Sequence, residues 1–170
     1  ISIFISADKL YAGKEDGLFW VDSQGGVHNE LTDELKINHS TDNFKYVSTW
    51  QTSTYFTIGR GMGEMTTSGT YRPMSPLATD DIGKLGDIVG VTADKDWLYV
   101  AVDEGTNIHI YKGRENYLNG GLRWEWCPWV FVGTNACTTI KVCQHSTTDR
   151  RLWFGYGTHT AYVVLSDNPL

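Results

Sequence analysis

A hairpin-like pattern recurs along the chain, and its spacing constrains the fold more than any other feature. In residues 8–26 an apolar pair, Leu10-Tyr11, leads to a charged tip, a second apolar run and a Gly-Gly turn. Similar patterns occur at 53–69, 94–113 and 149–168. The aromatic residues at the equivalent position are separated by 44, 44 and 54 residues, and they are Tyr11, Tyr55, Tyr99 and Trp153. The longer third interval is assigned to a loop insertion in the polar, glycine-rich segment 113–122.

Strand-like segments flank each hairpin, so the predicted repeat is a four-stranded antiparallel meander. The expected first strands are 1–6, 44–49, 88–93 and 139–144. The expected outer strands are 27–31, 71–74 and 124–131, and the fourth unit lacks one. A period of about 44 residues is typical of a β-propeller blade.

The sequence therefore predicts an all-β fold, a β-propeller of four-stranded blades in a single domain over residues 1–170. The blades are expected at about 1–37, 38–82, 83–133 and 134–170, with the last incomplete. Alternation in 97–102 puts Trp97, Tyr99 and Ala101 on one face and three aliphatic residues on the other, so both faces are apolar. A β-sandwich or β-barrel is the alternative, but neither predicts a 44-residue repeat.

Charge and cysteine content limit the classes of partner. The net charge of −6 disfavours nucleic acid, and the longest uncharged stretch, 126–140, contains turn residues and is not a membrane span. The chain begins on a strand-like segment without Met, which we interpret as part of a longer polypeptide. The three cysteines, Cys127, Cys137 and Cys143, are expected to be buried free thiols. A Cys137–Cys143 disulfide would have to join two positions of one strand, which is unfavourable.

Few residues have the spacing of a catalytic or metal site. The five histidines form no ligand pattern, so no metal and no cofactor are expected. No nucleophile motif occurs, and no catalytic residue is assigned. The carboxylates that could form a glycosidase pair mostly fall at hairpin tips, where a role in turns is favoured; they are Asp80, Asp81, Asp94, Asp96, Asp103 and Glu104.

The densest aromatic stretch is the best candidate for a binding surface. It is RWEWCPWVFVG, residues 123–133, and it follows a polar loop. Its tryptophans could form a platform that stacks on sugars, or they could pack between blades with Pro128 marking an edge strand. The candidate binding residues are Trp124, Trp126 and Trp129 with Arg114, Asn116 and Tyr117 of the loop.

Two groups of proteins have similar patterns. The form L-[YW]-x-G…G-L-x-x-x-D in residues 10–22 resembles the propeller repeats of bacterial two-component sensor ectodomains. Residues 84–170, with DRRLWFG at 149–155 and SDNP at 166–169 following the Trp-rich stretch, resemble propeller-like structural proteins of tailed phages and uncultured viruses. The second resemblance implies a virion or tail component without catalytic motifs. The Asp-box of sialidases is not present in the sequence.

These observations predict a non-enzymatic β-propeller of a phage virion or tail that acts as a rigid protein- or glycan-binding platform. The expected partners are other virion or tail proteins, copies of the chain itself and a host-surface glycan, with no nucleic acid and no membrane. One alternative is a glycan-cleaving propeller with carboxylates at the channel mouth. The other is a sensor ectodomain, which predicts a transmembrane helix in the flanking sequence.

Overall fold

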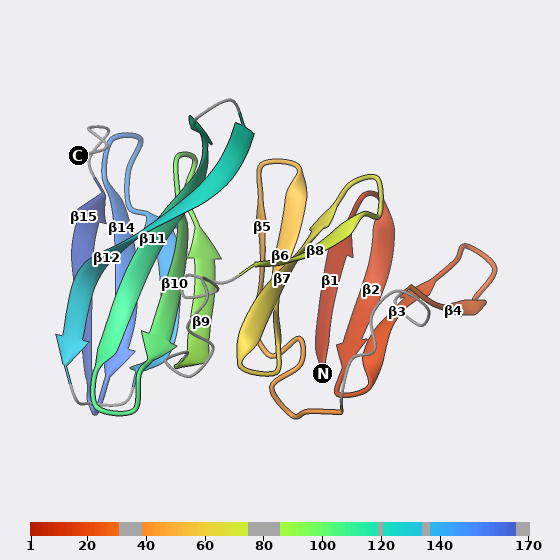
Figure 1. Cartoon of the computed structure of the whole chain (residues 1–170), viewed down its shortest axis with the longest axis horizontal. Helices are drawn as coiled ribbons and strands as arrows, with labels where there is room; N and C mark the ends of the chain where they lie inside the picture. The colour runs from red at the N-terminus through yellow and green to blue at the C-terminus, as the bar shows by residue number, and fades with distance from the viewer. Residues whose placement is uncertain (31–38, 75–85, 119–120, 134–136, 166–170) are drawn as a thin grey trace. The chain divides into compact units, whose positions relative to one another are not determined.

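The structure, a computed structural model, describes residues 1–30, 39–74, 86–118, 121–133 and 137–165. Within these ranges the chain forms strands and no helix (Figure 1). The strands make four separate antiparallel sheets in which neighbours in sequence are neighbours in space. The predicted all-β class and the repeated meander are confirmed.

Each sheet falls within one predicted repeat. The first sheet contains β1 (Ser2–Ser6), β2 (Lys9–Lys14), β3 (Gly17–Val21) and β4 (Val27–Asn29). The second contains β5 (Val47–Trp50), β6 (Ser53–Ile58), β7 (Gly61–Thr66) and β8 (Tyr71–Met74). The third contains β9 (Asp87–Ala93), β10 (Leu98–Asp103), β11 (Ile108–Leu118) and β12 (Gly121–Gly133). The fourth contains β13 (Cys137–Gln144), β14 (Arg150–Tyr156) and β15 (His159–Leu165).

Two segments differ from the prediction. The strand expected at 44–49 begins only at Val47, because Phe44 has a positive φ of 54° and turns the backbone before the strand. The expected loop at 113–122 is instead a continuation of β11 and β12, which pair as far as Leu118 opposite Gly121. A polar, glycine-rich composition alone does not distinguish a loop from a hairpin; the Asn-Gly dipeptide at 119–120 is the sequence signal that favours a hairpin.

The chain divides into two compact units, Ile1–Ser75 and Pro76–Leu170, and each contains two sheets. In the first unit, Tyr11 and Leu18 of the first sheet pack against Phe44, Phe56 and Met65. A Cβ at Gly13 would overlap Phe44, so the absence of a side chain there permits this close packing. The buried hydroxyls of Thr54 and Ser6 add a hydrogen bond of 2.7 Å between the two sheets.

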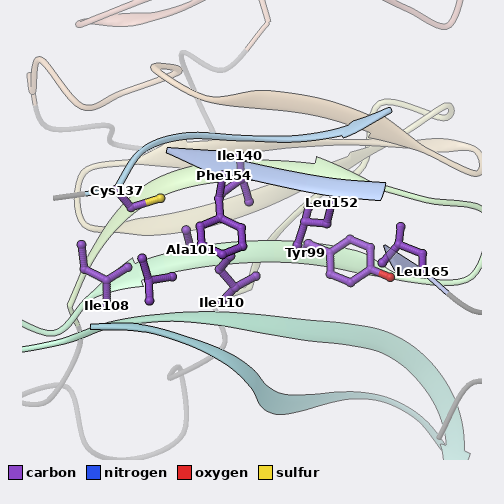
Figure 2. Close-up of a cluster of buried hydrophobic side chains, with 10 residues drawn as sticks. Tyr99, Ala101, Ile108, Ile110, Cys137, Ile140, Leu152, Phe154 and Leu165 are labelled. Atoms are coloured by element: carbon purple, nitrogen blue, oxygen red, sulfur yellow. The ribbon is translucent and has the colours of Figure 1, made fainter. Parts of the chain in front are cut away.

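In the second unit the third and fourth sheets share a larger apolar core (Figure 2). The third sheet contributes Tyr99, Ala101, Ile108, Ile110 and Val132. The fourth contributes Cys137, Ile140, Leu152, Phe154 and Leu165. A Cβ at Gly90 would lie 2.7 Å from Cγ1 of Ile140, so glycine again allows two sheets to approach closely. The backbone amide of Val142 donates to the buried hydroxyl of Thr92 at 3.1 Å.

The four repeat aromatics occupy equivalent positions on the second strand of their sheets. We call the face that carries them the leading face and the opposite face the trailing face. In the earlier sheet of each unit the repeat aromatic itself, Tyr11 or Tyr99, belongs to the core. In the later sheet the core contains the next residue of the strand instead, which is Phe56 after Tyr55 and Phe154 after Trp153. Because successive strand residues point to opposite faces, each unit packs the leading face of its earlier sheet on the trailing face of its later sheet.

This rule gives a direct test with a matched pair of leucines. Leu10 and Leu152 both precede the repeat aromatic and lie on trailing faces, but Leu10 is 47% exposed and Leu152 is fully buried. We expect Leu152→Ala to lower the free energy of unfolding by about 2–5 kcal/mol, because it opens a cavity between two sheets. Leu10→Ala should stay within about 0.5 kcal/mol of wild type. Urea unfolding at low protein concentration measures both values, and equal losses would contradict the assigned packing.

Candidate functional site

The candidate binding residues lie on the long hairpin of β11 and β12. Pairing between β10 and β11 ends at Leu98 opposite Gly113, whereas β11 and β12 remain paired beyond it. Residues 114–118 and 121–125, which we call the extension, therefore reach past the other strands of the sheet, as Figure 1 shows. The extension projects from a buried framework and presents two opposite faces.

Trp124 and Trp126 lie side by side on the trailing face. Their ring centroids are 5.2 Å apart and the ring planes differ by 16°, so the indoles are stacked. Trp126 pairs with Gly113, and a Cβ at this glycine would overlap the indole ring. The ring therefore lies directly against the backbone of β11, which limits its freedom to rotate.

Trp129 lies on the other face of the hairpin. Tyr111 pairs with Pro128 and Ile110 pairs with Val130, so Trp129 is the additional residue of a β-bulge. Its ring packs 5.3 Å from that of Tyr99 on the leading face. The three tryptophans therefore do not form one continuous platform. A bulge cannot be located from strict alternation, which explains why the sequence did not separate Trp129 from the other two.

Two of the predicted polar residues, Arg114 and Asn116, also lie on the leading face. The Arg114 guanidinium stacks 4.3 Å from the centroid of the Trp97 ring. Asn116 donates a side-chain hydrogen bond to Glu125 across the two strands. Tyr117 lies in β11 opposite Leu122, and its side chain is outside the described residues. Arg114 and Asn116 thus have structural contacts within the hairpin, and their binding role stays a prediction.

The sequence analysis missed the part that Trp97 and Lys112 play here. The Lys112 ammonium lies 4.8 Å from the ring centroid of Trp97 and 5.7 Å from that of Trp129. Such cation–π contacts order long side chains over aromatic surface. The turn between β10 and β11 sets a register with Lys112 opposite Tyr99, so the pairing could have been found by counting outward from the turn at 104–107.

The candidate carboxylates do not converge where the structure describes them. Asp94 and Asp96 precede β10, whereas Asp103 and Glu104 lie at its far end. A six-residue strand spans roughly 20 Å, well beyond the ~5–10 Å between the two carboxyl groups of a glycosidase. These two pairs therefore cannot act together on one glycosidic bond. The remaining candidates lie outside the described residues; they are Asp80 and Asp81.

Three of these carboxylates have contacts that explain their positions. Asp94 forms an ion pair with Arg150 that links the third sheet to the fourth, and both side chains are largely buried. Asp103 accepts a hydrogen bond from the Gly105 amide at 2.8 Å, which confirms its predicted role in the turn. Glu104 accepts one from the Tyr111 hydroxyl at 2.7 Å. Burial of the Tyr111 ring, followed by this contact with Glu104, raises the pKa of the phenol.

The prediction that all three cysteines are buried is wrong for two of them. Cys137 is buried in the core of the second unit, but Cys127 and Cys143 are exposed, and all three are free thiols. Cys127 lies on the edge strand β12, and Cys143 lies near the end of β13. An apolar context in sequence does not distinguish such positions from the interior of a sheet. Burial raises the pKa of the Cys137 thiol.

No metal site emerges from the described residues, which contain no group of three or more His, Cys, Asp or Glu side chains able to hold an ion. None of the described segments is a helix long and apolar enough to cross a membrane.

Comparison of the sequence with models of known protein families and with curated proteins finds no match to either.

The ion pair between Asp94 and Arg150 predicts a large stability effect. Arg150→Ala leaves the Asp94 carboxylate buried without its cation, and we expect the free energy of unfolding to fall by about 3–5 kcal/mol. The neighbouring Arg151 pairs with Asp149, and these side chains are 21% and 26% exposed, so Arg151→Ala is the matched control and should cost less. Thermal or urea unfolding compares the two, and similar losses would contradict the role assigned to Arg150.

Thiol reactivity tests the assignment of the cysteines. At about pH 8, a disulfide reagent should modify two thiols rapidly and the third only when urea unfolds the chain. Burial and a raised pKa leave little accessible thiolate at Cys137, and the thiolate is the reactive form. Cys137→Ser should keep the two fast reactions and remove the slow one. Three fast reactions in wild type would show that Cys137 is not protected.

Proposed function

We propose that the chain is a non-enzymatic β-propeller segment of a phage virion or tail protein. In this role it is a rigid platform whose loops and outer strands bind protein or glycan. Its partners are neighbouring virion or tail proteins, further copies of the chain and a host-surface glycan. The virion assignment rests on the resemblance of residues 84–170 to structural proteins of tailed phages.

The packing rule within the two units is the observation that supports the platform role most strongly. In both units the leading face of one sheet covers the trailing face of the next, with repeat aromatics in equivalent positions. Blades of a propeller are stacked face to face in this way around an axis. The sheets of each unit are held together by an apolar core, and loops on a rigid scaffold of this kind commonly carry binding residues.

The stacked indoles of Trp124 and Trp126 supply the binding surface. The face of an aromatic ring is a flat apolar area on which the C–H face of a sugar ring can stack, and Trp124 and Trp126 place two parallel rings together. The contact between Trp126 and Gly113 orients the rings before a ligand arrives, which reduces the entropy lost on binding. Trp124 lies on the extension, and Trp126 lies at its base, opposite Gly113.

The two alternative functions make different predictions. A glycan-cleaving enzyme needs a close pair of carboxylates, and Asp94, Asp96, Asp103 and Glu104 do not provide one across β10. A sensor ectodomain would be followed or preceded by a transmembrane helix in the full polypeptide. Capsid and tail genes beside the complete coding sequence would support the virion assignment instead.

Glycan binding tests the platform role. We expect the chain to bind host-surface glycans on an array. Titration calorimetry with the best ligand from the array then measures the affinity. Trp126→Ala and Trp124→Ala should each weaken binding at least tenfold, because each removes half of the stacked surface. Phe131→Ala is the matched control, since this exposed aromatic lies on the same strand and outside the pair. Equal effects of all three substitutions would contradict the assigned surface. Release of reducing sugar by the wild type would favour the enzyme.

A further inference from the structure

The trailing face of the first sheet carries an uncovered apolar row. Ile5 pairs with Leu10, Leu10 with Val21, and Val21 with Val27, so the row crosses all four strands. The exposed fractions of these side chains are 68%, 47%, 40% and 68%. Ile3 on the same face is 72% exposed. A continuous apolar patch of this kind marks an interaction surface more often than chance exposure does.

The fourth sheet shows what covers the equivalent row. Val142, Leu152 and Val163 occupy the corresponding cross-strand positions on its trailing face. Leu152 is fully buried and the two valines are partly buried, because the leading face of the third sheet lies over them with Tyr99 and Ile110. The row on the first sheet therefore has the composition and position of a surface that receives the leading face of another sheet.

The chain also carries an uncovered leading face, on the fourth sheet. Trp153 occupies the position that Tyr99 has on the third sheet, and its ring lies 4.7 Å from that of Tyr162. Tyr162 and Val164 are 47% and 56% exposed. The Arg151 guanidinium stacks 4.5 Å from the centroid of the Tyr162 ring, which adds to the flat surface of this face.

The leading face of the fourth sheet is not flat. A hollow of about 270 Å³ lies on it beside the Trp153 ring, with Lys141, Gly155 and Thr160 in its lining. Gly155 corresponds to Ala101 on the third sheet and Gly13 on the first, and a Cβ there would lie 2.5 Å from the hydroxyl of Thr138 on the same sheet. Phe44, which precedes the second sheet, packs over Gly13, and Ala101 is fully buried in the core shared by the third and fourth sheets.

We propose that the leading face of the fourth sheet in one copy of the chain packs on the trailing face of the first sheet in a second copy. This contact repeats between two molecules the sheet packing that already exists within each unit. It covers the exposed face of the fourth sheet in one copy and the exposed face of the first sheet in the other. It is heterologous, since different surfaces of the two copies meet, so association proceeds head to tail. The inference rests on the proposed platform role and names one partner of it.

Two single substitutions separate this arrangement from other modes of association. Leu10→Glu places a charge in the receiving row, and Val164→Glu places one on the opposing face. Each variant alone should be monomeric in sedimentation velocity. All molecules of one variant carry the charge on the same face, so no molecule offers the intact partner for the face that remains. An equimolar mixture should form a 1:1 dimer and nothing larger, since one intact face of each kind remains. Wild type should form dimers and larger species as its concentration rises, with association at least a hundredfold tighter than that of either variant.

Controls make the outcome decisive. Phe131→Glu changes an exposed apolar residue outside both faces and should associate like wild type. A wild type that stays monomeric at the highest attainable concentration overturns the proposal, and this result does not depend on the folding of any variant. A variant that dimerises alone would indicate a symmetric contact and also overturn it. Glycan binding by Trp124 and Trp126 should persist in every variant, so failure of the association and failure of the platform role are distinguishable.

Discussion

Both faces of each sheet must be covered, and the rest of the structure depends on this requirement. Strands such as β10 are apolar on both sides, so a single meander in water would expose two hydrophobic faces. Within each unit one sheet packs on the next, which covers one face of each sheet. Small residues at the contact, such as Gly13 and Gly90, allow the backbones to approach so that Phe44 and Ile140 fill the space above them. Buried hydroxyls pair across the sheets, which keeps these polar groups from opposing the packing.

The same packing positions the candidate binding surface. Arg150 of the fourth sheet holds Asp94, and the Asp94 amide bonds the carbonyl of Trp97 at 2.9 Å to close the turn before β10. Trp97 in turn supports the guanidinium of Arg114 at the start of the extension. A chain of direct contacts therefore links the core of the second unit to the hairpin that carries Trp124 and Trp126. Trp124 lies on the extension, and the base of the extension is fixed by these ionic and aromatic contacts.

The sequence predicted the fold class, the repeat and most strands, because alternation and the spacing of the aromatics are local properties of the chain. It failed where a feature depends on a partner strand. Phe44 has a positive φ and its side chain fills the space above Gly13 of the first sheet, and the bulge at Trp129 exists only relative to β11. Exposure of Cys127 and Cys143 likewise depends on which strands form edges and ends. The three candidate tryptophans were expected on an outer strand and the three polar candidates in a loop, whereas all six lie in the hairpin of β11 and β12. Alternation could not divide Trp129 from Trp124 and Trp126.

The overlap between the Trp126 ring and the space above Gly113 has a consequence for how this protein can change over generations. Any side chain at position 113 would displace the indole, and a smaller residue at position 126 would leave a bare patch of backbone. The two positions are therefore expected to co-vary, with glycine retained wherever tryptophan is kept. In a homologue without the aromatic pair, position 113 on β11 could carry a larger residue. The ligand preference of the hairpin would then change while the sheets beneath it stayed the same.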